Sequence, residues 1–295
     1  MKQQFFVTAL ALILGMAGKA QHSEPMVVKV AYKFIHIIDK QKPDTLHNEE
    51  LVLRIGKTSS AYNNYPFSVA IKPREAVAAP PAGGATRAVV GMPMAVVNDW
   101  GLTTALMEQK FTDKKLTRYE SVSLSKYEIE EKLPVIKWDI QTATKTIGGY
   151  TCQQASGLFG GRKYTAWFTT DLPFTTGPWK LNGLPGVILE AYDDKAEVFF
   201  IFKYISEAEE GELTVYPPDK PALKVTESVL KKAKDAYEND PGGITQAQAG
   251  VSGTIAVRFR DRKNKFHSGE AADKLMEEKK KNAKVVLTNP LELKP

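Results

Sequence analysis

The stretch that decides the fold reads Gly177-Pro178-Trp179-Lys180-Leu181-Asn182-Gly183-Leu184-Pro185-Gly186-Val187-Ile188-Leu189. Its prolines, Pro178 and Pro185, fix φ and donate no backbone hydrogen bond, so we expect them at strand edges. Its glycines, Gly177, Gly183 and Gly186, permit tight turning, and the last two are expected at positive φ. Together these five residues predict a rigid structural turn.

The apolar residues of the same stretch indicate where this turn leads. Trp179 and Leu184 can point from the turn toward apolar neighbours, and residues 187–189 have the composition of a buried strand. We therefore interpret the stretch as a corner through which the chain enters its core. The alternative, a loop that binds a ligand, stays open at this point.

Strand patterns surround the turn, with no helical pattern between them. Apolar residues alternate from Met26 to Ile38, and a dense series of short strand patterns follows Val135. Gly148-Gly149 and Gly160-Gly161 are predicted hairpin corners. Successive strands without intervening helices favour an antiparallel meander. The predicted fold is mainly β, a curved antiparallel sheet or half-barrel.

The last third of the chain adds helical patterns, which makes the predicted fold α+β. Thr226 is the predicted N-cap of one helix and Ser268 that of a second. The first helix is expected to turn one face inward, formed by Val229, Leu230, Ala233 and Tyr237. Residues 21–295 are expected to form a single domain with a flexible Ala/Pro/Gly-rich insertion near 76–91.

The N-terminus has the pattern of a cleavable export signal. Lys2 precedes an apolar run from Phe5 to Ala17, and Gly18-Lys19-Ala20 predicts signal-peptidase cleavage after Ala20. The apolar run is short for a membrane span, so we expect no integral membrane span. The formal charge of +6 is dispersed along the chain, which argues against nucleic acid as a partner. We expect a periplasmic or secreted protein.

The sequence offers few residues for catalysis. It has no Gly-x-Ser-x-Gly elbow, no His-Glu-x-x-His motif and no Cys-x-x-Cys pair. His36 and His47 can approach one another in the first hairpin, but two ligands do not make a metal site. Cys152 is the only cysteine, and we expect it to be buried rather than reactive. We therefore predict no enzymatic activity, no metal and no cofactor.

Three tryptophans lie close together in the sequence: Trp138, Trp167 and Trp179. In one interpretation they are large apolar anchors of a single core. In the other they form, with Leu184, a concave surface that binds an acyl chain or an apolar segment of a partner. The strand-like and turn-like patterns around them favour the core, and both interpretations stay open.

The run Gly183-Leu184-Pro185-Gly186-Val187-Ile188 resembles the signature of the GLPGLI family of exported Bacteroidetes proteins, with Val187 where the signature has Leu. The resemblance extends upstream through residues 138–140, 147–155, 161–168, 171–173 and 177–178. It implies an exported envelope protein, dominated by β-structure and of unassigned function. It supplies no catalytic residues.

Three functions follow from these observations. The first is a non-enzymatic exported envelope protein that binds an apolar ligand or a membrane-protein partner, such as an outer-membrane protein. The second is a structural partner of an outer-membrane receptor without a ligand cavity, and the third an envelope hydrolase. A deep cavity lined by tryptophan would favour the first, and a filled core with an exposed sheet edge the second. A cleft with two facing carboxylates would favour the third.

Overall fold

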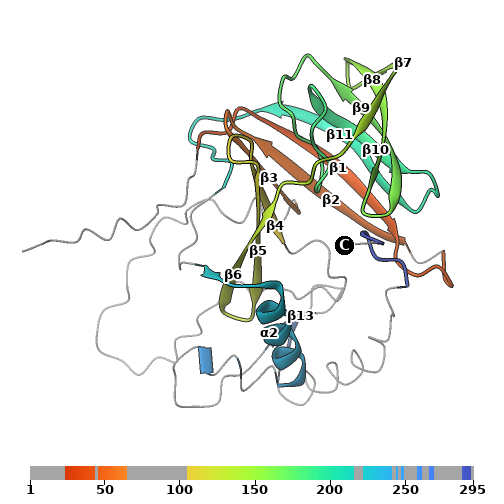
Figure 1. Ribbon diagram of the computed structural model, residues 1–295. Helices are drawn as coiled ribbons and strands as arrows, with labels where there is room; N and C mark the ends of the chain where they lie inside the picture. The colour runs from red at the N-terminus through yellow and green to blue at the C-terminus, as the bar shows by residue number, and fades with distance from the viewer. Residues whose placement is uncertain are drawn as a thin grey trace, which may run out of the picture.

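The computed structural model describes residues 24–43, 46–64, 105–215, 222–240, 244, 247–248, 258–260, 266–268 and 288–293. These residues are mostly β, in a sheet of twelve strands (Figure 1). The predicted signal peptide and the predicted insertion near 76–91 lie outside the described residues. Both stay predictions, as does the single domain.

Two antiparallel meanders make up the sheet. The first contains β1 (Val28–Ile37), β2 (Leu46–Ile55), β3 (Ser59–Asn64), β4 (Leu106–Lys110), β5 (Lys115–Val122) and β6 (Ser125–Lys132). The second contains β7 (Trp138–Ile147), β8 (Tyr150–Phe159), β9 (Arg162–Thr169), β10 (Val187–Asp193) and β11 (Val198–Glu207). A short strand, β12 (Leu223–Lys224), adds to β6 in parallel.

Pairing of β11 with β1 joins the two meanders. The order across the sheet is β12-β6-β5-β4-β3-β2-β1-β11-β10-β9-β8-β7. β1 therefore lies inside the sheet, and its sequence is apolar on both faces: Tyr32 and Phe34 are buried on one face and Ala31 on the other. The predicted antiparallel sheet is confirmed, and it is not closed into a barrel.

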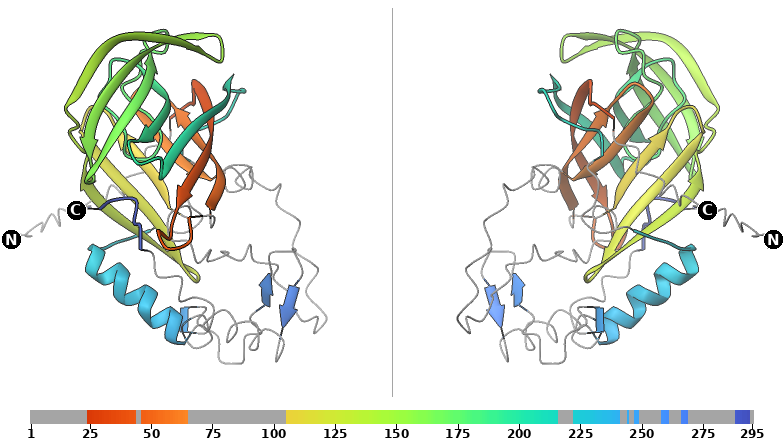
Figure 2. Two further views of the ribbon diagram at one scale, coloured as in Figure 1. Left: turned by 90° about the vertical axis from the view of Figure 1, so that its right-hand side faces the viewer. Right: turned by 90° about the vertical axis from the view of Figure 1, so that its left-hand side faces the viewer.

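The strand order forces this sheet to curl. β6 and β7 lie near opposite edges, yet only residues 133–137 connect them. A link of this length spans at most roughly 20 Å, so it draws the two edges toward each other. Figure 2 shows the resulting curl from two sides. In Figure 1, β4–β6 extend away from β7–β11, and the helix lies beside the tip of β5 and β6.

The two predicted glycine corners are hairpin turns in the structure. Gly148 and Gly149 have φ of 57° and 89°, and Gly160 and Gly161 have φ of 57° and 77°. Two successive residues at positive φ match the twist of the flanking strands, which is why such turns favour glycine. The corners join β7 to β8 and β8 to β9.

The first predicted helix is present as α2 (Glu227–Asn239). Its N-cap is Thr226, whose hydroxyl accepts a hydrogen bond from the Val229 N–H, as predicted. Leu230 is buried against Val122, Tyr127 and Ile129, and Ala233 and Tyr237 are partly buried there. Val229 is 46% exposed, so its predicted inward position is wrong, because α2 meets the sheet along a narrow line.

The predicted N-cap at Ser268 stays a prediction, because the residues that follow it lie outside the described ranges. Ser268 is the last residue of β14 (Phe266–Ser268), which pairs with β13 (Arg258–Arg260). The remainder of the predicted second helix lies outside the described residues.

Candidate functional site

The β9–β10 loop, residues 170–186, contains residues 177–186 of the stretch that decides the fold and lies inside the curl of the sheet. On β4, Gln109 Nε2 donates a hydrogen bond of 3.0 Å to the Trp179 carbonyl. On β7, Trp138 Nε1 donates one of 2.8 Å to the Asn182 carbonyl. β7 is the far edge of the sheet from β4. The loop can reach both strands because the sheet wraps around it.

Two apolar side chains of this loop lie in the main core. Trp179 is 5% exposed and Leu184 is 1% exposed. The Trp179 ring stacks on Phe200 of β11 with centroids 6.5 Å apart, and it lies 5.2 Å from the ring of Phe159 of β8. The backbone of Trp179 has φ of 57°, which is uncommon outside glycine. Nothing in the sequence signalled that conformation.

Trp167 lies on the other face of the sheet. Ala191 is paired with both Phe200 and Ala166, so those side chains share the face that holds Trp179. Trp167 follows Ala166 directly and therefore points the opposite way. There Lys145 Nζ lies 4.5 Å from the centroid of its ring. The three tryptophans consequently do not line one common surface.

The glycines of the motif act by two different means. Gly183 has the expected positive φ, 90°. Gly186 does not, and the prediction of positive φ there is wrong. A Cβ on Gly186 would lie 2.0 Å from the Thr169 carbonyl oxygen, so close backbone approach requires glycine. Gly177 is similar, because its Cβ would lie 2.8 Å from the Cβ of Ile188.

A cleft of about 990 Å³ opens beside the β9–β10 loop. Its apolar lining includes Ala105, Met107, Ile129, Trp179 and Leu291. The volume is typical of ligand pockets. Of the four residues predicted from sequence to bind a ligand or partner, Trp179 lines the cleft.

The remaining three, Trp138, Trp167 and Leu184, do not belong to the lining that the described residues form. Trp138 is half-buried and holds the β9–β10 loop through its indole N–H. Their predicted binding role stays a prediction.

Arg118 of β5 organises the charges on one wall of the cleft. Its guanidinium is ion-paired with Glu120 on the same strand and with Glu227 at the start of α2. Its Nε lies 3.3 Å from Glu131 Oε1 on β6. One cation therefore joins two strands and the helix.

Lys180 of the motif continues this chain of ion pairs. Its Nζ lies 3.0 Å from Glu131 Oε2 and 2.8 Å from Glu292 Oε1 near the C-terminus. The Lys180 side chain is 13% exposed, so both pairs are partly screened from water. Lys180 thereby connects the β9–β10 loop to β6 and to the end of the chain.

Glu130 completes the acidic lining. Its carboxylate lies 2.8 Å from Lys115 Nζ and is also ion-paired with Lys224. Hydrogen bonds from Lys115 and then Lys224 lower the pKa of Glu130 to about 2. This group is therefore ionised at neutral pH and cannot donate a proton.

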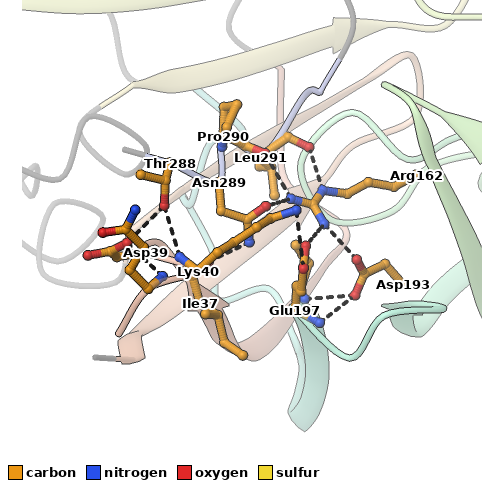
Figure 3. A network of polar contacts seen from close by, with 12 residues as sticks. Ile37, Asp39, Lys40, Arg162, Asp193, Glu197, Thr288, Asn289, Pro290 and Leu291 are labelled. Atoms are coloured by element: carbon orange, nitrogen blue, oxygen red, sulfur yellow. Dashed lines mark hydrogen bonds and ion pairs between the residues drawn. The ribbon is translucent and has the colours of Figure 1, made fainter. Parts of the chain in front are cut away.

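The end of the chain forms another wall of the cleft. Residues 288–293, here called the C-terminal strap, lie across Arg162 (Figure 3). Arg162 Nε donates to the Leu291 carbonyl at 3.1 Å, and Nη2 donates to Asn289 Oδ1 at 2.6 Å and to the Pro290 carbonyl at 2.9 Å. The Leu293 N–H donates to the Gly160 carbonyl at 2.7 Å.

Two carboxylates balance the charge of Arg162. Its Nη1 donates to Asp193 Oδ2 at 2.6 Å and to Glu197 Oε2 at 2.7 Å (Figure 3). Burial tends to raise the pKa of Glu197, but the hydrogen bond and charge of Arg162 outweigh it, so this pKa is lowered. Sequence reasoning missed Arg162, because its strap partners are more than 120 positions away along the chain.

The histidine pair and the single cysteine lie as expected. His36 is directly opposite His47 in the β1–β2 ladder, and His47 Nε2 is 3.1 Å from Glu49 Oε2. Burial, followed by the charge of Glu190, raises the pKa of the Cys152 thiol to about 11.

Across the described ranges, no cluster of three or more His, Cys, Asp or Glu is placed to hold a metal ion. No described helix is long and apolar enough to cross a membrane.

Comparison with known proteins adds a match in this region. A family model described as a protein of unknown function (Porph_ging) matches residues 160–190, and that family is associated with Bacteroidetes. The matched residues include Arg162, β9 and the β9–β10 loop. No curated protein matches the chain.

Two structures of PNGF-II are similar to the chain at low identity. They are in the C2 and P21 space groups, and both have 9% sequence identity and a TM-score of 0.49. The similarity covers 71% and 70% of this chain. It spans about a third of PNGF-II, 32% and 33% of those chains. This degree of likeness carries no argument about function.

Proposed function

We propose that this chain is a non-enzymatic exported envelope protein whose cleft binds an apolar ligand or an apolar segment of a membrane-protein partner. The observation that carries the proposal is the place of the cleft. Trp179, from the stretch that decides the fold, forms part of its apolar lining, together with Met107 and Leu291. Hydrophobic and aromatic side chains of this kind are the usual lining of a ligand site.

The charges around the cleft support binding over hydrolysis. Every glutamate of the lining is ion-paired with a lysine or an arginine; they are Glu120, Glu130, Glu131, Glu227 and Glu292. A hydrolase with two carboxylates needs one whose pKa is raised so that it can donate a proton. Glu130 has the opposite shift.

The structure also contains a feature that favours the second candidate function. β7 is an edge strand with mostly exposed side chains, and it pairs only with β8 among the described strands. Val135 beside it is 90% exposed and Leu158 on β8 is 70% exposed. An exposed edge of this kind can pair with a strand of another protein. A structural partner of an outer-membrane receptor would use this edge in place of the cleft.

The envelope location rests on the sequence. The signal pattern at residues 1–20 predicts export, and Gly183–Ile188 resembles the GLPGLI signature of exported Bacteroidetes proteins. The matched family, itself associated with Bacteroidetes, covers the same segment.

Titration with the neutral fluorophore N-phenyl-1-naphthylamine tests the proposal. We expect wild-type protein to show one saturable site. Ala105→Phe places a ring in the cleft and should weaken binding roughly ten-fold, because the probe loses apolar contacts. The matched control is Ala143→Phe on the exposed part of β7, which should bind as wild type does.

Both variants are first compared with wild type by thermal unfolding. If the wild type binds neither this fluorophore nor the peptide described in the next subsection, the proposed function is wrong. If Ala143→Phe weakens binding and Ala105→Phe does not, the fluorophore binds at the β7 edge and the cleft is not the site, which would favour the second candidate.

A further inference from the structure

β6 has an edge that the chain itself already uses for strand pairing. Lys224 of β12 lies opposite Glu128, and the Val225 N–H donates a hydrogen bond of 2.9 Å to the Glu128 carbonyl. Glu128 therefore directs its backbone groups away from β5. Along a strand of an antiparallel pair, the backbone N–H and C=O of successive residues point alternately toward the partner strand and away from it. The β5–β6 register has no bulge that would interrupt this alternation. The backbone N–H and C=O of Glu130 consequently point to the same open side.

The pairing with β12 stops before it reaches Glu130. The chain leaves β6 after Val225, and Thr226 begins α2. Glu130 lines the cleft, and its outward backbone groups have no partner among the residues that the structure describes. Unpaired N–H and C=O groups on a strand edge form a template for an added strand.

The walls of the cleft suit the side chains of such a strand. Alternate side chains of a strand added to β6 would point to the face of the sheet that carries Ile129, which lines the cleft. The intervening side chains would point away from this apolar lining. A segment that alternates apolar and polar residues therefore fits the cleft.

The charges of the cleft disfavour an acyl chain. Half of the lining residues are charged, and their ion pairs keep part of their contact with water. A hydrocarbon chain would remove that water and give no hydrogen bond in return, which is unfavourable. A polypeptide backbone supplies donors and acceptors beside these pairs.

From these contacts we propose that the occupant of the cleft is an extended polypeptide segment with alternating apolar and polar side chains, which adds to the edge of β6 at Glu130. The inference rests on the binding role proposed above and specifies its ligand. The pairing is continuous with the β12–β6 interface already present in the fold.

The test uses a fluorescein-labelled seven-residue peptide of alternating valine and threonine with a lysine at each end. Binding is measured by fluorescence anisotropy and by displacement of N-phenyl-1-naphthylamine. Glu130→Pro removes the outward N–H but no bond of the β5–β6 ladder, so it should weaken peptide binding roughly ten-fold. Glu130→Ala removes the side chain but keeps the N–H, so it measures the contribution of the side chain alone. The control expected to bind as wild type does is Ala143→Phe, on the exposed part of β7 and outside the cleft.

A second measurement remains decisive if Glu130→Pro does not fold. Two further peptides carry N-methyl groups on alternate residues. In the first the methylated amides are those that face β6, and in the second they are those that face away from it. The first should lose binding roughly ten-fold because its donors toward β6 are blocked, and the second should bind as the parent does.

If both N-methylated peptides bind equally well, strand addition is wrong. If the fluorophore binds and no peptide displaces it, this inference is wrong and the proposed function stands. If neither probe binds wild type, the proposed function itself is wrong.

Discussion

At the scale of single residues, Arg162 shows how a buried charge is accommodated. Its side chain is 1% exposed, and its guanidinium donates to two carboxylates, one carboxamide and two carbonyls. A lysine could not occupy the position equally well, because a planar fork of five donors is needed to reach all these acceptors. The same contacts hold the C-terminal strap against the cleft.

We predict that Arg162→Met will be strongly destabilised. The substitution leaves Asp193 buried without its cation, and breaking a buried ion pair in this way costs about 3–5 kcal/mol. Urea unfolding at pH 7 measures the loss. Lys145→Met is the control, because the partly exposed pair of Lys145 with Glu190 should contribute less than about 1 kcal/mol. Equal losses for the two variants would contradict the role given to Arg162.

We also predict a pH dependence from His36. Burial, and then the positive charge of Arg162, lower the pKa of His36 from 6.5 to about 4. Between these values the unfolded chain binds a proton that the folded chain does not, so stability falls as the pH is lowered. From pH 7 to pH 5 this group should remove about 2 kcal/mol from the free energy of unfolding.

His36→Leu should be less sensitive over the same pH interval. Urea unfolding at pH 7 and pH 5 checks this. The lowered pKa of Glu197 does not interfere, because its contribution is lost only below the ordinary value of 4.5. An equal pH dependence in wild type and variant would show that His36 is not the responsible group.

At the scale of elements, the β9–β10 loop is held by contacts with strands from both ends of the sheet. Two of its glycines have different physical requirements: Gly183 has positive φ, and Gly186 closely approaches the Thr169 carbonyl. A prediction follows from this difference. Gly183→Ala meets only Trp138 Nε1, at 3.9 Å, and should cost about 1 kcal/mol through backbone strain.

Gly186→Ala should cost considerably more, because its Cβ would overlap the Thr169 carbonyl and the backbone of β9 would have to move. Thermal unfolding of the two variants gives the comparison. Similar melting temperatures would mean that the loop can shift away from β9, and that it is not the fixed centre of the fold.

Some features of these elements could be predicted from the sequence, and others could not. Hairpin corners at Gly148-Gly149 and Gly160-Gly161, and the cap at Thr226, depend on residues close together in the chain, and local chemistry sufficed to predict them. The positive φ of Trp179 and the partners of Arg162 depend on which segments the sheet brings together. No local pattern contains that information, since the partners are separated by long stretches of chain.

At the scale of the whole molecule, the sheet curls around the β9–β10 loop, and the cleft lies where the curl stays open. Its lining comes from β4–β6, the loop, the C-terminal strap and the start of α2. The sequence predicted a curved sheet, but it could not place the cleft, because these segments are distant in the chain. The segment matched by the family model spans β9 and the loop, with Arg162 and Trp179.

Hydrogen–deuterium exchange, with and without the valine–threonine peptide, tests the central claim that the cleft is the binding site. The account predicts added protection in three separate segments: residues 129–131 of β6, residues 179–180 of the loop and residues 290–292 of the C-terminal strap. Protection confined to β7, or no added protection while the peptide is bound, would contradict it.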